Sequence, residues 1–303
     1  MVGVLGATGF LGTRVCQELK EQGIEYIPSP PHKDFDIRDT EDLYGFFDKQ
    51  GITKIINCAA YSGGLKFAMS HPVSILENNI DMILNIYATA VNSKVERIVN
   101  PISNCVYPAK ATLFKEDELW DGALHESVYM YGFTRRVELA MAWAYKKEYN
   151  FDSVNIVCSN MYGEGDHFDL LKSHALGALI MKFVDAEQNN TPEVVVWGTG
   201  KPVREWLYVG DAAKALIRGL DILPYDDIIN VGTGTGISMK DLALMIADFA
   251  GYKGKIVFDD SYPDGAPYKT VDGTRGKQIL GFAPSMPMEQ GIKQTIKWYK
   301  ENQ

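Results

Sequence analysis

The chain has 303 residues, of which 46% are hydrophobic and 23% charged, and its formal net charge at pH 7 is −9. This is ordinary globular composition, and the acidic balance argues against nucleic acid or an anionic membrane as a partner. The four cysteines fit neither a zinc site nor a CxxC pair, and no signal peptide or run of about 20 apolar residues is visible, so we expect a cytoplasmic protein without a metal.

The first half of the chain alternates short apolar runs with amphipathic segments. The pattern predicts a strand at 2–7, a helix at 11–23 that Gly23 ends, a strand at 24–29 and a helix at 40–51 that Thr40 caps. Strands at 53–60, 97–103 and 152–163 then alternate with long helices at 75–94 and 128–149. Such alternation is typical of an α/β protein with a doubly wound, Rossmann-type parallel sheet.

The alternation breaks at about residue 160. Short strands at 193–198, 228–232 and 255–260 and a helix at 238–252 lie between loops that contain glycine and proline. We therefore expect residues 1–159 plus about 205–235 to form a dinucleotide-binding domain. Residues 160–204 plus about 236–303 would form a smaller substrate-binding lobe.

Three glycines, Gly6, Gly9 and Gly12, form a GxxGxxG turn between the first strand and the first helix. Glycine lets the backbone approach a pyrophosphate closely, and the N-terminus of a helix offers N–H donors and partial positive charge. The strand, turn and helix in this order indicate a site for a nicotinamide dinucleotide.

The end of the second strand bears on the choice between NAD and NADP. An acidic residue there would bind the ribose 2′-hydroxyl of NAD, but no carboxylate occurs before Asp34. Ser29, His32 or Lys33 could instead meet a 2′-phosphate, although this proline-rich stretch could equally be a plain surface turn. We expect NADP and leave NAD open.

A candidate reaction centre follows the fourth strand. Ser103 lies just past that strand, and Tyr131 and Arg135 are four residues apart on the next long helix, so they share one face. A tyrosine hydroxyl can donate a proton to an alkoxide, and a nearby cation lowers its pKa. On their own, a tyrosine and an arginine on one helix face are more often structural.

Several longer motifs resemble one enzyme family. They are 6–12, 58–64 (CAAYSGG), 103–108 (SNCVYP), 160–163 (NMYG), 173–174 (SH), 196–200 (VWGTG), 204–207 (REWL), 230–232 (NVG) and 263–269 (PDGAPYK). Together they resemble the extended short-chain dehydrogenases/reductases of the NAD-dependent epimerase/dehydratase family, and most of all its GDP-L-fucose synthase group. The resemblance implies epimerisation of a GDP-4-keto-6-deoxy sugar followed by hydride reduction at carbon 4.

The resemblance also implies roles for individual residues. Ser103 would bind the sugar carbonyl and Tyr131 would deliver the proton in the reductive step, while Cys105 and His174 would be the base and acid of epimerisation. Without the motifs, Cys105 would be read as a small buried residue and His174 as a structural one.

One position departs from the family pattern. The family carries Tyr-x-x-x-Lys, and this chain carries Tyr131-Gly-Phe-Thr-Arg135. Arginine keeps the positive charge but is unlikely to relay protons, because its pKa lies above about 12. Arg135 could do the positioning work of the lysine, or the redox step could be impaired and leave an epimerase; we favour retained activity.

The binding positions that we expect form two sets. The cofactor set is Gly6, Thr8, Gly9, Phe10, Leu11, Gly12, Asp36, Ile37, Ala59, Ala60, Tyr131 and Arg135. The resemblance implies a substrate set of Asn160, Lys182, Trp197, Arg204 and Lys269, with Lys182 standing where the family has arginine. Trp197 could instead be core filler, and Asn160 a turn residue.

Alternative functions stay open. One is a reductase without epimerisation, and another is a redox-neutral epimerase or 4,6-dehydratase acting on a different nucleotide sugar. The dehydratases carry Asp-Glu where this chain has Asn104 and Cys105, and the 4-epimerases carry Tyr-Gly where it has Tyr107 and Pro108, which disfavours both. A non-catalytic protein of the same fold is a third possibility. The resemblance also implies a homodimer through the helices that contain 79–85 and 131–149.

Overall fold

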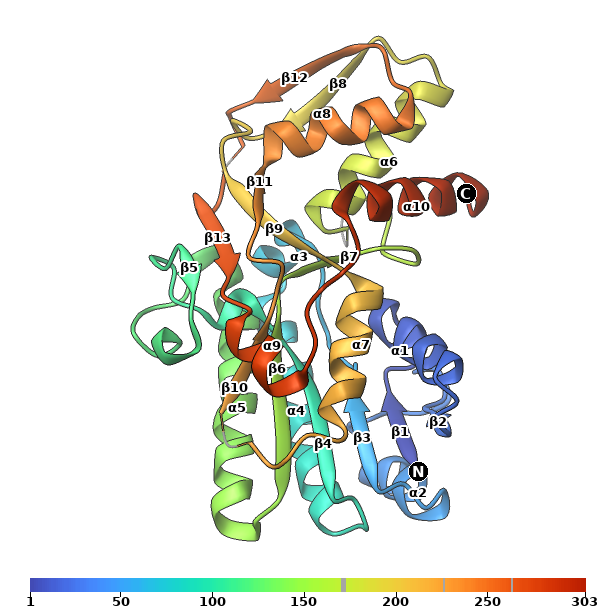
Figure 1. Cartoon of the computed structure of the whole chain (residues 1–303), viewed down its shortest axis with the longest axis vertical. Helices are drawn as coiled ribbons and strands as arrows, with labels where there is room; N and C mark the ends of the chain where they lie inside the picture. Colours follow the sequence, from blue (N-terminus) through green and yellow to red (C-terminus); the bar gives the residue numbers. More distant parts are fainter. Residues whose placement is uncertain (170–172, 226, 263) are drawn as a thin grey trace.

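The centre of the molecule is a parallel sheet of six strands in the order β10-β6-β4-β3-β1-β2 (Figure 1). The structure is a computed structural model that describes residues 1–169, 173–225, 227–262 and 264–303. The strands are β1 (Val2–Leu5), β2 (Tyr26–Pro28), β3 (Lys54–Asn57), β4 (Arg97–Ser103), β6 (Asp152–Cys158) and β10 (Ile228–Val231). Most of their residues are buried, as expected for a parallel sheet that is covered on both faces.

Helices cover both faces of this sheet, which confirms the predicted fold class. One hydrophobic core joins the sheet to α1 (Phe10–Glu21) and α7 (Val209–Gly219). A second core joins the opposite face to α2 (Thr40–Lys49), α4 (Pro72–Val91) and α5 (Tyr129–Tyr149). Because β1 lies between β2 and β3, the chain reverses direction across the sheet there, and the carboxyl ends of β1 and β3 form the crevice where such folds bind ligands.

A second lobe has its own hydrophobic core and lies above the sheet in Figure 1. Its helices are α6 (Ala175–Gln188), α8 (Met239–Ala250) and α10 (Met288–Glu301). Two small sheets accompany these helices. The first pairs β8 (Glu193–Trp197) with β12 (Lys255–Asp259). The second contains, in order, β11 (Gly236–Ser238), β9 (Val203–Tyr208), β13 (Tyr268–Val271) and β5 (Leu113–Phe114), and β7 (Asn160–Tyr162) also pairs with β9.

Short helices complete the connections. They are α3 (Leu65–Ser70), α9 (Thr274–Leu280), and the 3₁₀ turns η1 (Asn104–Val106), η2 (Glu116–Glu118) and η3 (Glu126–Val128). None of the helices in the described ranges is long and apolar enough to span a bilayer.

Two sequence predictions are corrected by the structure. Asp39, not Thr40, caps α2, because its carboxylate accepts hydrogen bonds from the backbone N–H groups of Glu41 and Asp42. The single strand expected at 152–163 is two strands: β6 lies in the main sheet, whereas β7 pairs with β9 in the second lobe. The chain therefore leaves the main sheet at Ser159.

Candidate active site

The glycine turn closes tightly over the end of β1. Gly6 has φ +66°, and a Cβ on it would lie 2.8 Å from the backbone nitrogen of Ala59. A Cβ on Gly12 would overlap the carbonyl oxygen of Gly6. The N-cap of α1 is Gly9, whose own N–H donates to the Gly6 carbonyl at 3.0 Å; no side chain caps the helix, so the backbone N–H groups of its first turn, which starts at Phe10, stay available to a ligand. The turn therefore fits a pyrophosphate.

The other predicted residues of this turn lie differently. Thr8 is exposed and borders the cavity described next. Leu11 is buried in the core between α1 and the sheet, so only its backbone faces the turn. Phe10 is half-buried and packs against the same core.

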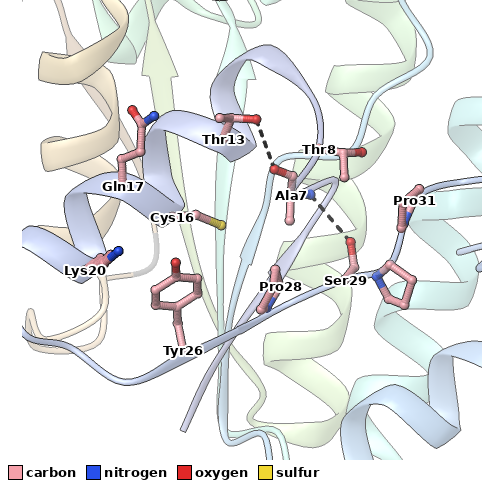
Figure 2. A pocket seen from close by; sticks show the side chains of 11 residues that line it. Ala7, Thr8, Thr13, Cys16, Gln17, Lys20, Tyr26, Pro28, Ser29 and Pro31 are labelled. Carbon is pink, nitrogen blue, oxygen red and sulfur yellow. Dashed lines mark hydrogen bonds between the residues drawn. The ribbon is translucent and has the colours of Figure 1, made fainter.

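A cavity of about 560 Å³ lies between α1 and the end of β2 (Figure 2). It is lined by Ala7, Thr8, Thr13, Cys16, Gln17, Lys20, Tyr26, Pro28, Ser29, Pro30 and Pro31. The backbone N–H of Ala7 donates to Ser29 Oγ at 3.5 Å, which ties the glycine turn to the end of β2. No Asp or Glu lines the cavity in the part of the chain that the structure describes.

The lining of this cavity shows which of the predicted residues could contact a 2′-phosphate bound there. Ser29 lines it, whereas His32 and Lys33 do not. Lys20 lines it as well, and sequence reasoning missed this residue. Its place at position i+4 from Cys16 on α1 was the available signal, because residues four apart share a helix face.

The remaining cofactor candidates lie in the loops that follow β2 and β3. The carboxylate of Asp36 pairs with Arg38 at 2.6 Å, and this hydrogen-bonded pair lowers the pKa of Asp36 to about 2. Ile37 is buried against α2 and α4. Ala59 is half-buried beside Gly6, and Ala60 is exposed.

Ser103, Cys105 and Tyr131 gather at the end of β4. Ser103 Oγ accepts a hydrogen bond from the backbone N–H of Cys105 at 3.2 Å and so caps η1. α5 approaches η1 closely because position 132 is glycine, where a Cβ would overlap the Cys105 carbonyl oxygen. Tyr131, the residue before this contact, is thereby held beside Cys105.

The environment of Tyr131 has opposing effects on its hydroxyl. Burial raises the pKa of Tyr131, the charge of Arg135 lowers it, and Cys105 and a carboxylate at position 138 raise it again. A hydrogen bond with the Ser62 side chain also lowers this pKa. The net direction is upward, so the phenol holds its proton more strongly than a free tyrosine does.

Arg135 bonds to two buried side chains of the protein. Its Nη1 donates to Glu138 Oε2 at 2.7 Å, and its Nη2 donates to Asn79 Oδ1 at 2.6 Å. Its side chain is 3% exposed, and its guanidinium carbon lies 5.3 Å from the centre of the Tyr131 ring. The terminal nitrogens thus bond to protein groups, and the guanidinium faces the tyrosine ring.

His174 belongs to the other lobe, at the N-cap of α6. His174 is exposed as a whole residue, but the protein around its imidazole excludes enough water to lower its pKa, and the charge of His167 acts in the same direction. Asp166 lies nearby, in contact with the first turn of α6 at Gly177. Burial raises the pKa of Asp166 to about 7, and sequence reasoning missed this residue.

Two basic residues expected to bind substrate are adjacent. Arg204 and Lys269 are Cα partners in the parallel pairing of β9 with β13. His125, before η3, belongs with them: burial lowers its pKa, and the charges of Lys269 and Arg204 lower it further. Sequence reasoning missed His125, since the loop that carries it gives no local signal.

The remaining substrate candidates lie in separate settings. Lys182 Nζ is 4.8 Å from the centre of the Trp197 ring and donates to the Val195 carbonyl at 2.9 Å. Trp197 is 48% exposed and stacks on Tyr262, with ring centres 4.5 Å apart. Asn160 donates its side-chain amide to the Glu205 carbonyl at 2.9 Å, which ties β7 to β9. Pro263 of the 263–269 motif lies outside the described residues.

The chain is similar to known proteins over nearly its whole length. Residues 2–232 match the model of the NAD dependent epimerase/dehydratase family. The GDP-L-fucose synthase of Escherichia coli (strain K12) is 32% identical over 310 residues, which cover 99% of this chain and 96% of that protein.

Two solved structures are similar over nearly the whole chain. A GDP-L-fucose synthetase from Naegleria fowleri bound to NADP is 29% identical, with a TM-score of 0.88 over 99% of this chain and 94% of that one. A GDP-6-OMe-4-keto-L-xylo-heptose reductase from C. jejuni has a TM-score of 0.91 over 100% of this chain and 98% of that one. Its identity is 24%, so this second likeness speaks for the fold alone.

Proposed function

Because the chain belongs to the NAD dependent epimerase/dehydratase family, we propose that it is an NADP-dependent epimerase-reductase acting on a GDP-4-keto-6-deoxy sugar. The observation that carries the proposal is the junction at η1, where Ser103, Cys105 and Tyr131 meet beside the crevice at the end of β1 and β3. The similarity to GDP-L-fucose synthase over 99% of the chain supplies the substrate class.

The residues present fit a nicotinamide dinucleotide phosphate. Gly6, Gly9 and Gly12 leave room for its pyrophosphate at the uncapped start of α1. Ser29 and Lys20, in a cavity without a described carboxylate, suit a 2′-phosphate better than a 2′-hydroxyl. When bound, the reduced cofactor supplies the hydride for carbon 4 of the sugar.

The chain's own groups handle the proton of the reductive step. Ser103 Oγ would donate a hydrogen bond to the ketone oxygen and stabilise the negative charge that develops there. Tyr131 would pass its hydroxyl proton to that oxygen, yielding an alcohol. Its raised pKa keeps the phenol protonated and ready to donate.

Cys105 and His174 would exchange protons at the carbons next to the ketone. Cys105, as a thiolate, would remove a proton from one face of the ring, and protonated His174 would return one to the other face. Each such exchange inverts the configuration at one carbon and involves no net oxidation or reduction. It requires the two lobes to hold the sugar between η1 and the start of α6, where these residues lie.

The substrate diphosphate would lie against Arg204 and Lys269, whose adjacent cations suit phosphate oxygens. Lys182, Trp197 and Asn160 would contact the rest of the nucleotide sugar. As domains we propose a dinucleotide-binding domain of residues 1–159 plus about 205–235 and a substrate-binding lobe of residues 160–204 plus about 236–303, with β5 of the first part pairing into the sheet of the second.

We also propose a cytoplasmic homodimer. The four cysteines are free thiols, the state typical of a reducing compartment. The outer faces of α4 and α5 expose large apolar side chains, among them Leu84 on α4 and Tyr129, Phe133 and Trp143 on α5. An apolar face of this kind is usually covered by a partner, and a second copy of the chain supplies a matching one.

Incubation with NADPH and GDP-4-keto-6-deoxymannose tests the function. We expect NADPH consumption and a product inverted at the carbons next to the former ketone. Consumption without inversion would identify a reductase, and inversion without consumption a redox-neutral epimerase. If neither occurs and the substrate merely binds, the enzymatic proposal fails.

A further inference from the structure

A buried ion pair lies directly behind the proposed proton donor. The Nη1 of Arg135 is 2.7 Å from Oε2 of Glu138, and the two side chains are 3% and 1% exposed. Tyr131, Arg135 and Glu138 follow one another at i, i+4 and i+7 on α5, so they occupy one face of the helix. The phenol, the guanidinium and the carboxylate therefore form a single stack along that face.

Two buried amides from neighbouring elements hold the pair. Asn79 of α4 accepts a hydrogen bond from Arg135 Nη2 at 2.6 Å, and the Asn57 amide at the end of β3 donates to Glu138 Oε1 at 3.4 Å. Asn79 also bonds the backbone N–H and carbonyl of Tyr61, the residue before Ser62. Ser62 in turn bonds the Tyr131 hydroxyl, so Asn79 contacts both the ion pair and the loop that reaches the phenol.

From this arrangement we propose that Glu138 is a positioning residue, which keeps the Arg135 guanidinium against the Tyr131 ring and neutralises its charge there. A guanidinium can meet two acceptors at once through its planar fork, whereas a lysine ammonium offers a single point of charge. Each member of a buried pair requires the other, because an unpaired buried charge is costly. Only the kinetic consequence of this inference rests on the proposed function.

The consequence concerns the protonation of Tyr131. The titratable groups that act on it are Arg135 and Glu138 on its own helix and Cys105 on η1. An isolated cation behind the ring would favour the phenolate, but the carboxylate of Glu138 opposes that effect. Glu138 therefore keeps the phenol protonated to a higher pH than Arg135 alone would allow.

A titration of the cofactor-free protein tests this without any assay of activity. The ionisation of Tyr131 is followed by tyrosine absorbance, as the difference between each protein and the same protein carrying Tyr131→Phe. Glu138→Gln should lower the pH at which Tyr131 ionises by about one unit or more. The control Glu148→Gln, an exposed position on the same helix, should leave it unchanged. An unmoved ionisation in Glu138→Gln would overturn the proposal.

A second variant serves if Glu138→Gln does not fold. The double change Arg135→Met with Glu138→Leu replaces the pair by apolar groups of similar size, which buried sites often tolerate. The two charges act on Tyr131 in opposite directions, with Arg135 the stronger, so their joint removal should produce at most a small rise in the pH at which Tyr131 ionises. A large rise would mean that Arg135 acts on Tyr131 unopposed, and the proposal would be wrong.

Kinetics give an independent check. Arg135→Lys and Glu138→Gln should be coupled, so that their combined effect on the rate of hydride transfer differs from the product of the single effects by about tenfold, equivalent to about 1.4 kcal/mol. Multiplicative losses would contradict the proposal. If the wild type transfers no hydride, the proposed function fails, while the titration still decides the role of Glu138.

Discussion

Arg204 and Lys269 stand side by side on adjacent parallel strands, because they are Cα partners in the pairing of β9 with β13. Partners in such a pairing project from the same face of the sheet. Burial also lowers the pKa of Arg204, a sign that its charge is partly desolvated before any ligand binds. Two neighbouring cations, of which Arg204 is already partly desolvated, are well suited to bind a diphosphate.

Arg204→Ala should therefore weaken binding of the nucleotide sugar. A hydrogen bond to a charged group contributes about 1.5–3 kcal/mol, so KM should rise roughly tenfold to a hundredfold, with a smaller effect on kcat. Steady-state kinetics at constant NADPH measure it. Lys253→Ala, which removes an exposed lysine of the same lobe, is the matched control. Equal KM values for the two variants would remove Arg204 from the diphosphate site.

Ser29→Asp should shift cofactor preference from NADP towards NAD. A carboxylate at the end of β2 would repel a 2′-phosphate and bind a ribose 2′-hydroxyl. We expect NADPH affinity to fall by about tenfold or more and NADH affinity to hold or rise, measured by the fluorescence of the bound reduced cofactors. An unchanged ratio of the two affinities would show that the 2′ position lies elsewhere.

Gly12→Ala should abolish cofactor binding and lower the melting temperature. The added Cβ would overlap the carbonyl oxygen of Gly6 and lie 2.8 Å from the Cα of Ala7, so the turn would have to open. Gly45→Ala in α2 is the control, since its Cβ would meet only the Lys49 ammonium, at 3.9 Å. That change should raise stability by about 1 kcal/mol, because alanine favours helix. Normal NADPH binding by Gly12→Ala would show that position 12 does not need to lie so close to the Gly6 carbonyl for the cofactor to bind.

Asp166 should make folding less favourable as the pH rises. Burial raises its pKa in the folded protein to about 7, above the ordinary value of 3.8. Below about pH 4 the carboxyl is protonated in both the folded and the unfolded chain, so it does not reduce the free energy of unfolding. Between about pH 4 and pH 7 it ionises readily only in the unfolded chain, and the free energy of unfolding falls progressively. Asp166→Asn should therefore be more stable than wild type at pH 8 but not at pH 4, by denaturant unfolding. Asp121→Asn, at an exposed position, should show no such difference.

Trp143→Asp should separate the proposed dimer. Trp143 is 64% exposed on the outer face of α5, and a charge there would be buried without a partner on association. We expect the mass measured by light scattering to fall to that of one chain. Leu223→Asp changes an 86% exposed residue away from α4 and α5 and should leave the mass unchanged. A monomeric wild type would contradict the dimer at once.

Much of the fold could be read from local patterns. The alternation of apolar strands with amphipathic helices predicted the doubly wound sheet, and the predicted strand at 97–103 coincides with β4. The errors arose where local signals compete: Asp39 and Thr40 can both cap a helix, and the apolar run at 152–163 conceals the passage from one sheet to another at Ser159. The residues of a segment show its propensity to form a strand, but they do not show which other strand it will pair with.

Only part of the candidate site could be predicted from local sequence patterns. Its motif residues could be named in advance, but His125, Asp166 and Glu138 could not, because nothing beside them in the chain marks them. The bond between Arg135 and Asn79 joins residues 56 positions apart, and that between Asn57 and Glu138 spans 81. Such contacts exist only after the sheet and helices have packed.

The amino-acid order alone thus determined the Rossmann-type architecture and the glycine turn and named the candidate reactive side chains, because periodicity, backbone freedom and chemical type are properties of short segments. Tertiary structure decided what surrounds those side chains: a guanidinium neutralised behind Tyr131, two cations set side by side at Arg204 and Lys269, and a carboxyl with a raised pKa at Asp166. Burial and the distance between charges govern protonation and binding, and both are set only when distant segments meet.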